Sequence, residues 1–109
     1  MITPETIAAA YSELLEKDSA QFEAEEYRIE KSLAREKKYM ETINEAQADG
    51  ITDPARQQQK AMKATREELT ALNLAEKAAR KAAHAYRQAG IRVDSLVKQM
   101  QAHELAKQK

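Results

Sequence analysis

A chain of 109 residues forms one domain at most, and its formal net charge at pH 7 is zero. Ala, Glu, Lys, Leu and Arg supply more than half of the residues, a proportion typical of coiled coils and long helices. Cys is absent, which excludes a disulfide framework, a thiolate nucleophile and a Cys-based zinc site. No alternating apolar run indicates a strand, so we expect an all-α fold.

A helix start signal lies at Thr3, Pro4 and Glu5. The hydroxyl can cap the helix, Pro fits its first position, and the acid favours its positive end. These residues predict a first helix over about 4–48. They form neither the basic nor the apolar part of a secretory signal, and no apolar run approaches the length of a membrane span. We therefore expect a cytoplasmic protein with no membrane partner.

The first helix carries an apolar stripe whose members recur at helical spacing. Glu26 and Glu36 interrupt the stripe, and we interpret them as positions that set the register or lie at its rim. We expect this stripe to face a second helix. Its members are Leu15, Phe22, Ile29, Leu33, Met40 and Ile43.

Residues 49–53 have the composition of a tight turn between two helices. Gly50 suits the left-handed position just past a helix end, and Ile51 can touch back onto the last turn. Asp53 is a good N-cap, and Pro54 fits the first helical position. A connection this short predicts a long antiparallel, coiled-coil-like helical hairpin within a single domain over residues 1–109.

The second helix is expected over about 54–89, with a stripe that includes Met62, Thr65, Leu69 and Leu72. Facing positions should have numbers that sum to about 102, because the turn is centred near residue 51. This register places large side chains of the first helix on small ones of the second. The predicted contacts are Phe22 on Ala79, Ala82 and Ala83, Ile29 on Leu72, Leu33 on Leu69, and Met40 on Met62.

Charge is distributed unevenly, with an acidic excess in residues 1–50 and an equal basic excess in residues 51–109. The favoured interpretation is that the two helices neutralise each other across their shared interface. The predicted ion pairs join Glu25 and Glu26 to Lys77, Glu23 to Arg80, and Glu16 to Arg87.

Gly90 leaves two alternatives for the end of the chain. A single long helix can tolerate a glycine at a cost of about 1 kcal/mol relative to alanine. A break would instead give a short third helix over about 95–106, capped by Asp94. We favour the break or a kink, and we expect residues 102–109 to fray.

Residues for catalysis or metal binding do not form a recognisable pattern. His84 and His103 lack acids at metal-ligand spacing, and Lys107 stands where a zincin motif needs a second His. Two glycines cannot build a phosphate-binding loop. We therefore expect a non-enzymatic protein with no catalytic residue, no metal and no cofactor.

The apolar and alanine-rich faces of both helices are wider than one interface needs. We therefore expect another protein or a second copy of the chain as partner, as for an adaptor, a small chaperone or an inhibitor that self-associates. The residues expected to pack or to bind this partner are Phe22, Tyr27, Leu69, Leu72 and Leu74.

A strip of basic residues on the second helix supports an alternative function, association with nucleic acid. Against it, the chain is neutral overall, the second helix is poor in aromatic residues for base stacking, and the acidic first helix competes for the same cations. The strip consists of Lys77, Arg80, Lys81, Arg87 and Arg92.

Overall fold

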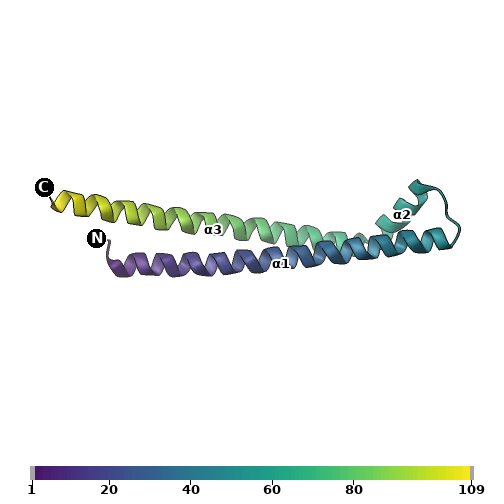
Figure 1. Cartoon of the computed structure of the whole chain (residues 1–109), viewed down its shortest axis with the longest axis horizontal. Helices are drawn as coiled ribbons and strands as arrows, with labels where there is room; N and C mark the ends of the chain where they lie inside the picture. Colours follow the sequence, from purple (N-terminus) through teal and green to yellow (C-terminus); the bar gives the residue numbers. More distant parts are fainter. Residues whose placement is uncertain (1, 109) are drawn as a thin grey trace. The chain divides into compact units, whose positions relative to one another are not determined.

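The chain is an all-α helical hairpin in a computed structural model that describes residues 2–108. Helix α1 spans Pro4–Ala48, α2 spans Pro54–Ala64 and α3 spans Arg66–Lys107 (Figure 1). The described residues contain no strand. The fold class predicted from the sequence is therefore confirmed, and α1 has the predicted bounds.

The residue contacts divide the chain into two compact units. The first unit, the terminal unit, contains the described residues of segments 1–23 and 80–109, which belong to α1 and α3. The second, the turn unit, contains residues 24–79, with the end of α1, all of α2 and the start of α3. In each unit, two segments that are distant in the sequence pack against each other.

The turn after α1 forms as its sequence indicates. Gly50 adopts a φ of 85°, and the N–H of Ile51 donates to the carbonyl of Ala46 over 3.0 Å, which is the hydrogen bond of a Schellman cap. Asp53 caps α2 by accepting from the N–H of Ala55 over 3.2 Å. The buried Gln57 adds a side-chain hydrogen bond of 2.6 Å to the carbonyl of Ile51.

The second helix of the hairpin is interrupted at Thr65, where we predicted a continuous helix. Thr65 leaves the helical region with φ −106° and ψ 17°, and its hydroxyl donates to the carbonyl of Ala61 over 2.8 Å. A threonine side chain that bonds back in this way competes with the helical hydrogen bonds. Its side chain is the largest that is fully buried among the described residues.

The predicted break at Gly90 is wrong, because α3 continues through it to Lys107. A Cβ built on Gly90 would lie 3.9 Å from Cδ1 of Leu14, so this glycine lies against α1 within the terminal unit. Asp94 does not cap a new helix, since its carboxylate pairs with Lys98 over 3.6 Å. The predicted fraying is also wrong for residues 102–107, which are helical, whereas Lys109 lies outside the described residues.

The predicted inward stripe of α1 is wrong. The residues that pack inward in their place are each one position earlier in the sequence than the stripe residues. All stripe residues except Ile43 are exposed. One residue corresponds to about 100° around a helix. Alanines such as Ala10 and Ala46 are buried instead, because small residues let two helix backbones approach closely. The inward residues that immediately precede stripe residues are Leu14, Gln21, Arg28, Ser32, Tyr39 and Thr42.

On α2 and α3 the predicted inward face is partly correct. Thr65 and Leu72 are buried as predicted, but Met62 and Leu69 are exposed. The positions that replace these two are each one residue earlier, Ala61 and Glu68. Phe22 is 65% exposed, so the predicted packing of this ring on alanines is wrong.

Candidate interaction surfaces

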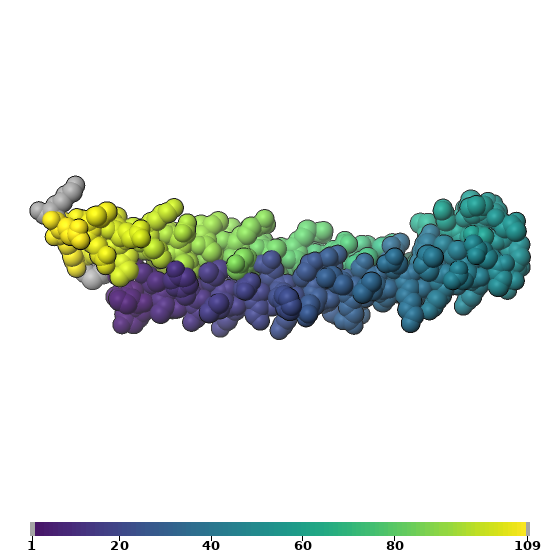
Figure 2. Space-filling model, viewed as in Figure 1, coloured from purple at the N-terminus to yellow at the C-terminus, as the bar shows by residue number. Residues whose placement is uncertain are grey.

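The turn unit exposes most of its large apolar side chains on one patch, which we call the apolar patch. Met40 and Met62 line one hollow between α1 and α2, and Met62 and Leu69 line the next. Ile29 and Leu33 continue the patch along α1 at a spacing of four residues. In the view of Figure 2, no other segment covers the near side of residues 24–48, drawn in blue. The patch consists of Ile29, Leu33, Met40, Met62 and Leu69, which are 37–60% exposed.

The two edges of the apolar patch differ in character. Along one edge, Ser32 and Tyr39 line the hollow that contains Met62. Along the other edge, Glu30 and Lys37 are exposed, and neither forms an ion pair with any of residues 2–108. The second edge is therefore able to form ion pairs with a partner.

One ion pair joins α1 to α3 in the turn unit. Nζ of Lys38 on α1 lies 2.6 Å from Oε1 of Glu68 on α3. The hydrogen bond from Lys38 lowers the pKa of Glu68, and the same bond raises the pKa of Lys38. On α1 itself, the side-chain hydrogen bond from Arg28 lowers the pKa of Glu25.

The five residues expected to bind a partner do not form one surface. Leu72 is buried within the turn unit, whereas Leu69 belongs to the apolar patch. Leu74 and Tyr27 are exposed, and the ammonium of Lys31 lies 5.0 Å from the centre of the Tyr27 ring. Phe22 is exposed in the terminal unit. The sequence predicted that Met40 and Met62 lie together, and they line one hollow, but the predicted interior position of both is wrong, because both are exposed.

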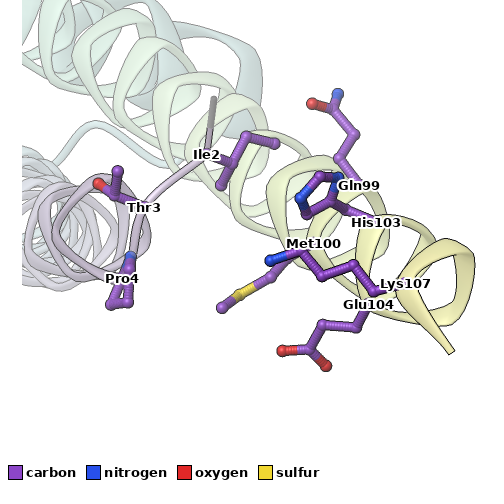
Figure 3. Close-up of a pocket in the computed structure, with 8 residues that line it drawn as sticks. All are labelled: Ile2, Thr3, Pro4, Gln99, Met100, His103, Glu104 and Lys107. Carbon is purple, nitrogen blue, oxygen red and sulfur yellow. The ribbon is translucent and has the colours of Figure 1, made fainter.

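The terminal unit contains a cavity of about 530 Å³ between the start of α1 and the end of α3. Figure 3 shows Ile2 on one side of this cavity and Met100 and Lys107 on the other. His103 and Glu104 also line it. The sequence pattern does not indicate this cavity, because its walls come from opposite ends of the chain.

All five residues of the basic strip are exposed. Arg92 pairs with Glu13 over 3.6 Å within the terminal unit, and Lys77 lies in the turn unit. None of the predicted ion pairs with α1 forms, so Arg80, Lys81 and Arg87 have no acidic partner among residues 2–108. The first helix therefore does not neutralise these three cations.

Within the described part of the chain, no three His, Asp or Glu side chains cluster closely enough to hold a metal ion. No helix of the described residues combines the length and the apolarity needed to cross a membrane. Comparison with protein-family models, with curated proteins and with solved structures finds no match to this chain.

Proposed function

We propose that this chain is a non-enzymatic, cytoplasmic protein–protein interaction module that presents helix faces to a partner and also associates with itself. It would act as an adaptor, a small chaperone or an inhibitor. The observation that carries the proposal is the placement of side chains in the turn unit, where Ile29, Leu33, Met40 and Met62 are exposed.

The same unit buries only one large apolar side chain, Leu72, beside alanines and three polar residues. Burial of a large apolar side chain stabilises a protein by about 1.5–3 kcal/mol. Most large apolar side chains of this unit remain exposed in the single chain and so do not contribute this free energy. A partner that covers the apolar patch would bury them and would be stabilised by that burial. Contiguous apolar patches on soluble proteins commonly mark interaction sites.

A capture experiment from the native host tests this function. We expect the wild-type chain to retain a specific protein, and we expect Leu33→Glu to lose it, because the charge would be buried in the interface. Ile91→Glu is the matched control, since Ile91 is 62% exposed but belongs to the terminal unit. Equal capture by wild type and Leu33→Glu would refute a role for the apolar patch.

A second candidate function is association with nucleic acid through the basic strip. The observation in its favour is that Arg80, Lys81 and Arg87 are exposed and have no acidic partner among residues 2–108. Exposed cations at helical spacing can neutralise phosphates, and such binding weakens steeply with salt. The test is a gel shift at low salt, in which replacing all three residues by Gln should abolish retardation. Absence of retardation with the wild-type chain would exclude this function.

A further inference from the structure

We propose that the apolar patch binds the same patch of a second copy, with the two α1 helices antiparallel about a twofold axis that passes between Leu33 and Glu36. The inference rests on the proposed interaction function and names its partner. A twofold interface requires a surface that is complementary to itself. Both the apolar residues and the charges of this patch meet that requirement.

The apolar residues on α1 match their own copies in this arrangement. Ile29, Leu33 and Met40 follow each other by four and seven residues, the spacing of a coiled-coil stripe. In the antiparallel alignment, Ile29 faces the partner's Met40, and Met40 faces the partner's Ile29. Leu33 faces the partner's Glu36 near the axis. All three apolar side chains are exposed in the single chain, so no rearrangement of the hairpin is needed.

The charged edge of the patch is also complementary to itself. Glu30 and Lys37 lie seven residues apart, on the edge of α1 away from the hollow that contains Met62. The antiparallel alignment places Lys37 beside the partner's Glu30, and Glu30 beside the partner's Lys37. Both residues are exposed and have no ion-pair partner among residues 2–108. Opposite charges along such an edge set the orientation of paired helices.

A parallel alignment of the two copies is less favourable. It would bring Glu25 beside the partner's Glu30, and like charges at this position repel. The antiparallel alignment also places Met62 and Leu69 of both copies on the same side of the paired α1 helices. There the two hairpins can pack as a four-helix arrangement.

Glu36 limits the strength of this interface. It interrupts the apolar stripe between Leu33 and Met40 and is exposed in the single chain. A polar residue at such a position fixes the register of paired helices but weakens them. The patch is also smaller than the roughly 20–30 residues a side of a standard interface. We therefore expect a dimer that dissociates in the micromolar range.

Sedimentation equilibrium of the full chain tests the arrangement through charge reversal. Glu30→Lys and Lys37→Glu should each raise the dissociation constant by about tenfold, because each variant places like charges at two rim positions of the dimer. The double variant Glu30→Lys/Lys37→Glu should restore the wild-type value. An equal mixture of the two single variants should form a heterodimer as stable as the wild-type dimer. Glu36→Leu should tighten the dimer.

Glu45→Lys is the matched control, since Glu45 is exposed on α1 without an ion pair. At about 100° per residue, Glu45 points about 60° away from Glu30 and about 80° away from Lys37 around the helix. Circular dichroism of every variant establishes that the helices persist. A tighter dimer in Glu30→Lys would indicate parallel pairing and overturn the inference. A strictly monomeric wild-type chain at high micromolar concentration would also overturn it, whereas capture of another protein that depends on Leu33 would still support the interaction function.

Discussion

The two units of the hairpin hold their helices together with different side chains. In the terminal unit, the inward residues are mainly aliphatic: Ala89 and Val93 are buried, and Leu14, Leu96 and Met100 are half-buried. In the turn unit, three of the buried residues are polar, and they are Thr42, Gln57 and Thr65.

This difference shows that large apolar side chains contribute little to the packing between helices in the turn unit. Its local structure depends on hydrogen bonds: the cap at Gly50, the bond from Gln57 to the carbonyl of Ile51, and the bond from Thr65 to the carbonyl of Ala61. Each such bond contributes about 1 kcal/mol net. The large apolar side chains are left on the surface, where they can bind a partner.

The largest expected effect comes from Leu72→Asp, which removes the only large apolar side chain buried in the turn unit. Loss of a buried leucine costs about 2–5 kcal/mol, and a buried unpaired carboxylate adds to that cost. We expect the variant to lose most of its helicity at room temperature, as measured by circular dichroism. Unchanged helicity and melting would show that Leu72 does not hold α3 against α1.

Leu74→Asp provides the control for that experiment, since Leu74 is 65% exposed on the same helix. The same substitution should change the melting temperature little, because the carboxylate stays in water. If both variants unfolded equally, the cost would come from helix propensity and not from burial.

Replacing the two glycines in turn should give effects of about 1 kcal/mol and opposite sign. Gly50→Ala should destabilise the turn unit, because a φ of 85° is strained for a residue with a Cβ. Gly90→Ala should stabilise the terminal unit, since the new methyl group would lie at an ordinary contact distance, 3.9 Å from Cδ1 of Leu14. Urea denaturation of each variant measures the change in the free energy of unfolding. Destabilisation by Gly90→Ala would show that α3 needs this glycine.

Features that depend on neighbouring residues were predictable from the sequence. The start of α1 at Pro4, its end at Ala48 and the cap by Asp53 all follow from residue types at fixed offsets. The signals at Gly50 also occur near Gly90, but there they do not end a helix. The difference is that Gly90 lies against Leu14 of α1, a contact that local sequence does not reveal.

Features that depend on which helix faces meet were not predictable. The apolar stripe of α1 shows that the helix has an apolar side, but not which segment covers that side. We assigned it to the second helix of the hairpin, whereas alanines on both helices occupy that interface and Leu33 and Met40 remain exposed. The same rotation of α1 separates the predicted ion pairs and leaves the expected partner residues on different surfaces.

The smallest expected effect concerns pH and the ion pair between Lys38 and Glu68. The hydrogen bond from Lys38 lowers the pKa of Glu68 below its ordinary value of 4.5. A carboxyl group with a lowered pKa in the folded state stabilises that state above its ordinary pKa. This contribution is lost as the pH falls through the lowered value, where the folded chain also takes up the proton.

Thermal melts of wild type and Glu68→Gln between pH 7 and pH 3 measure this contribution. The variant should melt slightly below wild type near pH 7, and the difference should shrink as the pH falls below 4.5. Glu25→Gln is the control, because Glu25 pairs with Arg28 on the same helix and does not connect α1 to α3. A larger effect at Glu68 than at Glu25 would show that the ion pair between helices supplements the weak apolar packing of the turn unit. Equal effects would indicate that both acids stabilise only their own helices, and that Leu72, the buried alanines and the hydrogen bonds hold this unit together without the ion pair.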